Sequence, residues 1–180
     1  MKYTQEDIIK GCFREEREYQ KALYETYSSK MFAICLRYLS NREDAEDMLQ
    51  DTFIKIFSAP KYFENISNLD AWIRKVFVNN ILTHFKSKKK IFASYEVENI
   101  AEQEDFVFDV DTEKFTTKEL LQALFSLKKE ERIIFNMLEL EDLSYKEVES
   151  ITKRNASTIR SINMRAKIKM KNFLNQIKKQ

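Results

Sequence analysis

The sequence predicts an all-α protein of two small helical domains joined by an acidic linker, and three observations lead to this prediction. The 180-residue chain contains one Gly and one Pro, whereas β-sandwiches and barrels need many turns that carry these residues. Apolar residues recur at steps of three and four on both sides of a central stretch, which is typical of amphipathic helices. That stretch, residues 91–113, carries eight acids and no base. We therefore expect domains at 1–91 and 116–180 and a linker at 92–115.

The composition argues against several functional classes. A single Gly is too few for the phosphate-binding loops of Rossmann and P-loop proteins. Cys12 and Cys35 lie 23 positions apart and His84 is the one histidine, a set that matches no zinc or redox motif. We expect two reduced thiols, no metal, no other cofactor and no enzymatic site. No signal peptide or membrane-spanning stretch is apparent, so we expect a cytoplasmic protein.

In the first half, the apolar pattern predicts a helix over 22–39, a second helix after Asn41 and a third over 70–85. Asn41 can cap the second helix, whose first turn is acidic and therefore suits the positive end of the helix dipole. The stretch 58–68 contains the one proline and reads as a loop. This half is expected to form a small helical bundle.

In the second half, the pattern predicts helices over 118–127 and 130–140. Ser144 and Glu147 have the spacing of a capping box at the start of a short helix. Asn155 can cap a longer basic helix after a tight turn. A short capped helix, a tight turn and a longer basic helix indicate a helix-turn-helix.

The last 31 residues contain no acid. Their nine bases are Lys153, Arg154, Arg160, Arg165, Lys167, Lys169, Lys171, Lys178 and Lys179. Charge of one sign resists compact packing unless something anionic neutralises it. We therefore expect nucleic acid as a partner, in preference to a solvated helical face.

Several segments together resemble the ECF (extracytoplasmic-function) sigma factors of bacterial RNA polymerase, over about residues 20–90 and 117–175. The matching segments are REDAEDMLQDTF at 42–53, Trp72 and Ile73 followed by Asn79, LSYKEV at 143–148, TIRS at 158–161, and Arg165 with Ala166. The resemblance implies a region 2-like bundle and a region 4-like helix-turn-helix. It also implies a promoter-specificity subunit that directs transcription initiation and leaves the chemistry to the polymerase.

The resemblance implies core RNA polymerase as a partner, through its β′ clamp and β flap. The residues that would bind the polymerase are Asp44, Asp47, Gln50, Asp51 and Phe53. An acidic helix suits a basic partner surface, with Phe53 as the apolar anchor. An anti-sigma factor is a further possible partner, although no residue of the chain points to one.

The resemblance also assigns two sets of DNA contacts. The duplex −35 element would be bound by Lys153, Arg154, Asn155, Ala156, Ser157, Thr158, Arg160, Ser161, Arg165 and Lys167. The single-stranded −10 element would be bound by Tyr62, Phe63, Asn65, Lys75, Asn79, Asn80, Lys86 and Lys88. Ala156, Ser157, Arg160 and Ser161 are best placed for base edges, and the remaining cations of the −35 set are candidates for phosphate.

Some alternatives stay open. Phe63 and Trp72 are better explained as core residues than as base contacts, and Arg160 is equally explained as a phosphate contact alone. The acidic linker would thread the RNA path of the polymerase, or it is an ordinary disordered tether.

Two other functions also remain. An autonomous helix-turn-helix regulator that binds duplex DNA as a dimer explains the basic tail but not the acidic segment 43–51. A helical protein-interaction adaptor leaves the tail unexplained.

Overall fold

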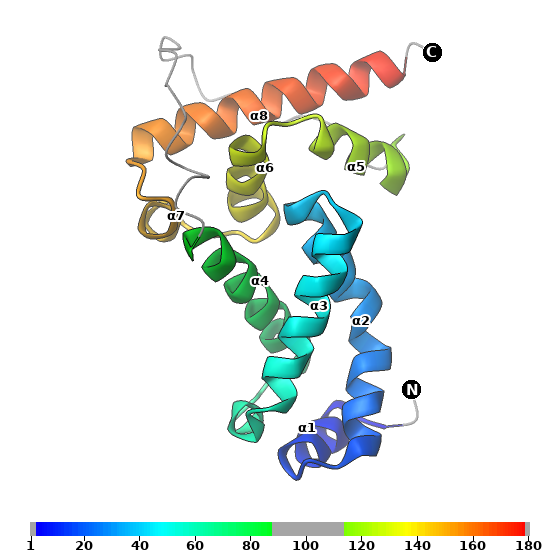
Figure 1. Cartoon of the computed structure of the whole chain (residues 1–180). Helices are drawn as coiled ribbons and strands as arrows, with labels where there is room; N and C mark the ends of the chain where they lie inside the picture. The colour runs from blue at the N-terminus through cyan, green and yellow to red at the C-terminus, as the bar shows by residue number, and fades with distance from the viewer. Residues whose placement is uncertain (1–2, 88–113, 179–180) are drawn as a thin grey trace. The chain divides into compact units, whose positions relative to one another are not determined.

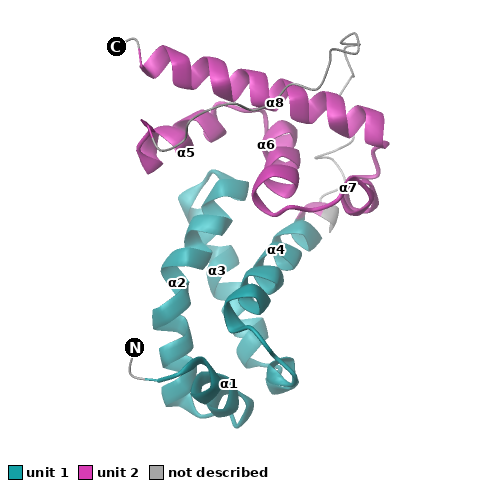
Figure 2. Cartoon of the chain, turned by 180° about the vertical axis from the view of Figure 1, so that it is seen from behind, with its two compact units in different colours: residues 1–84 teal, residues 85–180 magenta. Residues whose placement is uncertain are grey.

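The structure is a computed structural model that describes residues 3–87 and 114–178 (Figure 1). The chain divides into two compact units, residues 1–84 and 85–180 (Figure 2). Every regular element in the described residues is helical, which confirms the all-α prediction. The expected linker lies outside the described residues up to position 113.

The first unit is built from four α-helices and one short 3-10 turn (Figure 1). They are α1 (Gln5–Phe13), α2 (Arg17–Leu39), α3 (Arg42–Phe57), η1 (Pro60–Phe63) and α4 (Leu69–Ser87). Leu23 and Tyr38 of α2, Ile56 of α3 and Phe77 of α4 are fully buried. The core of the unit therefore lies where α2, α3 and α4 face one another.

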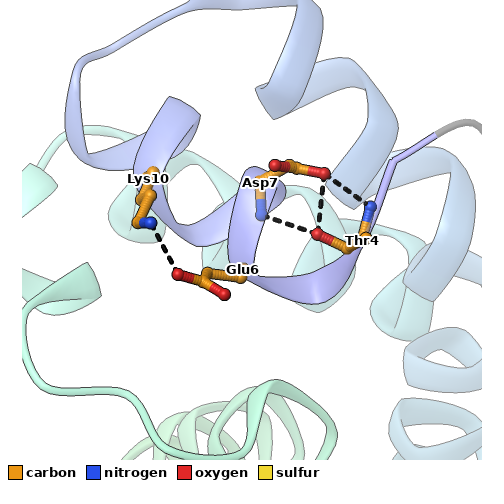
Figure 3. A network of polar contacts seen from close by, with 4 residues as sticks. All are labelled: Thr4, Glu6, Asp7 and Lys10. Atoms are coloured by element: carbon orange, nitrogen blue, oxygen red, sulfur yellow. Dashed lines mark hydrogen bonds and ion pairs between the residues drawn. The ribbon is translucent and has the colours of Figure 1, made fainter.

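Side-chain caps determine where the helices of this unit begin. The Asn41 Oδ1 accepts a hydrogen bond from the backbone N–H of Glu43 at 3.0 Å, which confirms the predicted cap of α3. At α1, Thr4 and Asp7 form a reciprocal capping box (Figure 3). The hydrogen bonds that Thr4 donates lower the pKa of the Asp7 carboxyl. A carboxylate at the N-terminus of a helix is also stabilised by the positive end of the helix dipole.

The described residues of the second unit form four α-helices, one of which, α6, continues into a π-helical turn. They are α5 (Thr117–Phe125), α6 (Lys129–Phe135), η4 (Asn136–Leu140), α7 (Tyr145–Thr152) and α8 (Ala156–Ile177). Leu124, Phe135, Ala166 and Leu174 are buried together, and Phe115 packs against this cluster. The segment predicted as one helix over 130–140 is thus α6 followed by η4.

The close packing of α1 on α2 depends on Gly11. This glycine is buried in α1, and a Cβ placed on it would lie 2.1 Å from Cγ of Tyr19 and 2.6 Å from its Cβ. The ring of Tyr19 therefore lies directly against the helix backbone, and the ring of Tyr3 packs on it with centroids 4.8 Å apart. No side chain larger than hydrogen fits at position 11.

Gly11→Ala is expected to destabilise the first unit. Alanine normally favours a helix by about 1 kcal/mol over glycine, but overpacking here costs roughly 1–3 kcal/mol and displaces Tyr19. Thermal unfolding followed by fluorescence of Trp72, the one tryptophan of the chain, should show a lower Tm. In a Tyr19→Gly background the same substitution should not lower the Tm further. An unchanged Tm for Gly11→Ala alone would contradict the prediction.

Candidate functional site

One face of α3 is acidic and ends in an exposed apolar side chain. Asp44, Asp47, Gln50 and Asp51 are all exposed. Ile54 is 61% exposed, the largest value among the exposed large apolar residues of the described chain. Asp47, Asp51 and Ile54 are separated by four and three positions, so they lie on one face of the helix. The structure therefore brings the predicted acids together around Ile54.

Phe53, predicted to be the apolar anchor of this face, is a core residue. It is 3% exposed, and its ring lies 4.9 Å from that of Tyr24 and 5.2 Å from that of Phe77, centroid to centroid. Phe53 is about 100° around the helix from Ile54, because successive helical residues are separated by that angle. The exposed apolar side chain on the acidic face is therefore Ile54 and not Phe53. Counting helical steps from Asp47 would have pointed to Ile54 as the apolar residue on that face.

The residues predicted to bind single-stranded DNA differ in accessibility. Tyr62 in η1 is 54% exposed, and Asn65, Lys75 and Asn79 are also exposed. Asn65 adopts a left-handed backbone conformation with φ of 59°, which Asn tolerates better than most residues. These four side chains can meet a partner without rearrangement of the unit.

Asn80 instead joins α4 to α3. Its amide nitrogen donates to Thr52 Oγ1 at 2.7 Å and lies 3.4 Å from the Met48 sulfur. Its amide oxygen accepts a hydrogen bond from Lys55 Nζ at 2.8 Å. Both ends of the amide are therefore engaged within the first unit, and Asn80 would have to break these bonds to reach a base.

Phe63 is buried and packs against the half-buried Trp72, with ring centroids 5.2 Å apart. The core interpretation of Phe63 is therefore confirmed, and its ring offers no exposed platform for a base. Lys88 lies outside the described residues, as does the side chain of Lys86.

The helix-turn-helix of the second unit forms as its local sequence predicts. Ser144 and Glu147 form the expected capping box at α7. Lys153 takes a left-handed conformation with φ of 59° and ends α7. Asn155 Oδ1 then accepts from the backbone N–H of Thr158 at 2.8 Å and starts α8. The turn is therefore defined by backbone conformation and by caps on both sides.

Three acids of α6 and η4 neutralise bases of α8 and of the turn before it. The pairs are Arg154 Nε to Glu130 Oε1 at 3.1 Å, Lys169 Nζ to Glu131 Oε1 at 2.7 Å, and Lys167 Nζ to Glu139 Oε1 at 2.8 Å. Glu130 and Glu131 are buried. The expectation that the basic tail needs an outside anion to pack is thus wrong for these bases, because the fold itself supplies the anions.

The ion pairs change the roles expected for three cations. The side chains of Arg154 and Lys167 are each 19% exposed, so both are engaged inside the unit rather than offered to phosphate. Arg165 is half-buried, and its charge acts on Glu130. Burial raises the pKa of the Glu130 carboxyl, while the charges of Arg154 and Arg165 act in the opposite direction.

Asn163 is a polar core residue of α8. It is buried, and its amide nitrogen donates to Glu139 Oε1 at 2.7 Å. Glu139 therefore holds both Asn163 and Lys167. The signal in the sequence was a polar residue placed within the apolar face of α8, because such a residue needs a buried hydrogen-bond partner.

The N-terminal part of α8 keeps an exposed polar surface. Lys153, Ser157 and Arg160 are exposed, and Ala156 and Ser161 are half-buried. The guanidinium carbon of Arg160 lies 5.5 Å from the centroid of the Tyr145 ring at the start of α7. This surface, rather than the whole basic helix, is available to a ligand.

No helix in the described residues is long and apolar enough to cross a membrane. Within the same residues, no group of three or more His, Cys, Asp or Glu side chains is arranged to hold a metal ion.

Models of known protein families match both units. The family model described as Sigma-70 region 2 matches residues 23–91, and that described as Sigma-70, region 4 matches residues 117–170. A helical bundle followed by a helix-turn-helix, each matching its sigma region, defines a bacterial transcription initiation factor. The chain belongs to the sigma factor family, in its ECF group, and as such directs promoter recognition by RNA polymerase.

Two relatives that match by sequence agree with this assignment. RNA polymerase sigma factor SigV of Bacillus subtilis is 23% identical over 151 residues, covering 82% of this chain and 88% of the relative. The ECF RNA polymerase sigma-E factor of Haemophilus influenzae is 24% identical over 179 residues, covering 94% of each. A Bartonella quintana structure of the sigma factor RpoE with the anti-sigma factor NepR aligns with a TM-score of 0.48 and 22% identity, over 86% of this chain and 96% of that one.

Glu130 should make the second unit less stable as pH rises. Because its pKa is raised above the ordinary 4.5 in the folded state, folding favours the protonated form. That contribution is complete below pH 4.5 and is lost as pH rises through the folded pKa. Relative to Glu130→Gln, which cannot titrate, the wild type should therefore lose stability over this range.

Hydrogen exchange of α8 amides in the full chain, compared between variants at each pH, measures this difference. Glu149→Gln, on α7, is the matched control and should follow the wild type. Parallel pH profiles for wild type and Glu130→Gln would contradict the prediction.

Proposed function

We propose that this sigma factor uses three separate surfaces. The acidic face of α3 binds the β′ clamp of core RNA polymerase, and exposed residues of η1 and α4 hold the melted −10 strand. The N-terminal end of α8 reads the −35 duplex. The observation that supports this proposal most directly is the acidic face of α3 with its exposed Ile54, within the unit that matches sigma region 2.

The acidic face of α3 has the chemistry of a protein interface. Exposed acids precede Ile54 on one face of α3, and Ile54 supplies apolar area at the C-terminal end of that face. Beside it lies a hollow of about 330 Å³ between α2 and α3, lined by Tyr24, Phe32 and Gln50 among others. An apolar side chain of a basic partner helix can enter this hollow while its cations meet Asp47 and Asp51.

The −10 surface has the groups needed to trap extruded bases. Opening a duplex without ATP requires that unpaired bases be stabilised on the protein. Stacking on an aromatic ring contributes about 1–3 kcal/mol per base, and Tyr62 is the exposed ring of η1. Asn79 offers an exposed amide for a base edge, and Lys75 a cation for the backbone.

At the −35 surface, the exposed end of α8 is the part suited to the major groove. Ser157 and Arg160 are placed for base edges, and Lys153 for phosphate. Arg154, Arg165 and Lys167 act through the fold by securing the turn and α8.

The remaining expectations belong to the same proposal. The chain works in the cytoplasm, performs no catalytic step of its own, and also contacts the β flap. An anti-sigma factor is an expected regulator. The path of the acidic segment through the polymerase falls on residues outside those described.

Asp47→Lys combined with Ile54→Ala should abolish salt-resistant co-purification with bacterial core RNA polymerase. Both side chains are exposed, so the Tm should change little. Glu25→Lys, an equal charge change on the exposed surface of α2, is the matched control and should bind as the wild type does. Phe53→Ala should instead lower the free energy of unfolding by roughly 3–5 kcal/mol.

Other outcomes of this experiment favour the other functions. Failure of the wild type to bind polymerase, with tight binding to a palindromic duplex, would indicate an autonomous regulator. Failure to bind either would indicate an adaptor.

Asn79→Ala and Asn80→Ala should separate function from stability. Asn79→Ala should reduce strand opening, measured by permanganate reactivity of unpaired thymines, on a promoter selected by the wild-type holoenzyme from random duplexes. Its Tm should stay unchanged, because the side chain is exposed. Asn80→Ala should lower the Tm, since it loses the part-buried hydrogen bond to Thr52 and the bond from Lys55, and a typical hydrogen bond contributes about 0.5–1.5 kcal/mol. Normal opening by Asn79→Ala would count against the −10 assignment.

A further inference from the structure

We propose that Tyr145 is a positioning residue that holds Arg160 edge-on toward a guanine of the −35 duplex. This inference rests on the proposed function of α8. It adds a residue from the first helix of the helix-turn-helix to the recognition of one base pair, and it names the base.

The contact that carries the inference is a cation–π contact between α7 and α8. The Arg160 guanidinium carbon lies 5.5 Å from the centroid of the Tyr145 ring. Within the described part of the chain, this is the one ionic or aromatic contact that the structure gives Arg160. Arg154, Lys167 and Lys169 are each held by a carboxylate instead. Arg160 is therefore restrained by a different kind of partner.

The kind of partner decides which donors stay available. A carboxylate occupies the N–H groups of a cation with hydrogen bonds. An aromatic ring attracts the face of the guanidinium and leaves its five N–H donors, which point outward in the guanidinium plane, free. A pair of parallel in-plane donors matches O6 and N7 of guanine in the major groove. Stacking on Tyr145 thus restricts the motion of Arg160 without blocking its reading edge.

Tyr145 is itself well positioned for this role. It is the first residue of α7, directly after the Ser144 cap. The left-handed Lys153 and the Arg154–Glu130 ion pair fix the turn into α8. Val148 of α7 and Ile159 of α8 are fully buried, so the two helices cannot slide apart freely. Each of these features holds the ring where Arg160 can lie over it.

A purely structural role for Tyr145 makes a different prediction. Its side chain is 37% exposed, so removing it opens no closed cavity and should affect stability little. Tyr145→Phe keeps the ring and removes only the hydroxyl, whereas Tyr145→Leu keeps apolar bulk and removes the ring. A role through Arg160 is retained in the first variant and lost in the second.

The stack can be tested without DNA. In the full-length protein, the side-chain Nε–H resonance of Arg160, assigned by its loss in Arg160→Ala, should show a ring-current shift. That shift should persist in Tyr145→Phe and disappear in Tyr145→Leu. An identical resonance in wild type and Tyr145→Leu would overturn the inference.

The consequence for recognition is tested with full-length protein assembled with bacterial core RNA polymerase. A duplex is first selected from a pool with a random upstream element, and each base pair is then varied. Arg160→Ala should remove a preference of about tenfold for guanine at one position, the usual size for a bidentate contact. Tyr145→Leu should reduce the same preference by about threefold, as expected for an exposed cation–π contact, and Tyr145→Phe should retain it.

Two results would overturn the inference, and they are distinguishable. If Arg160→Ala removes the preference but Tyr145→Leu leaves it intact, Tyr145 does not position Arg160, and the base contact stands. Arg160 contacts phosphate alone if Arg160→Ala weakens binding to all duplexes equally and reduces the slope of log affinity against log salt concentration by about one. In that case the proposed base contact fails, and the role of Tyr145 fails with it.

Discussion

The second unit depends on the neutralisation of the basic helix α8 by acids of α6 and η4. Without Glu130 and Glu139, the largely covered side chains of Arg154 and Lys167 would lie in the unit without these hydrogen-bonding partners. Burying an unpaired charge costs several kcal/mol even after relaxation, so this arrangement favours the packing of α8. It also limits the exposed basic surface, because Arg154 and Lys167 are engaged within the unit while Ser157 and Arg160, near the start of α8, stay exposed.

The first unit shows a similar separation between residues that hold the fold and residues that are presented. On α3, Phe53 faces the core while Ile54 and the acids face outward. On α4, Asn80 is bonded to α3 while its neighbour Asn79 is exposed. In both cases adjacent residues of the same chemical type have different roles, because one helical step turns the side chain by about 100°.

Local structure followed closely from local sequence. The caps at Asn41, Ser144 and Asn155 occur where the pattern predicted them. These caps depend on residues two or three positions apart, which the start of any helix brings together. The π-helical turn after α6 and the hydrogen bond between Asn163 and Glu139, 24 positions apart, were not predicted. They depend on which helices meet, and no local pattern specifies that.

The sequence by itself determined the class of this protein: all-α, with two helical domains, a helix-turn-helix and the segments typical of an ECF sigma factor. Composition, helical periodicity and capping residues are sufficient for the helical domains, because they act over a few neighbouring positions, whereas the family was indicated by the resemblance of those segments. Only the tertiary structure decided which cations and amides are free to bind. Arg154 pairs with Glu130 across 24 positions, and Arg160 meets Tyr145 across the turn between two helices. Availability depends on partners brought together by packing, which is why the exposed surface is smaller and more specific than the charge of the tail suggested.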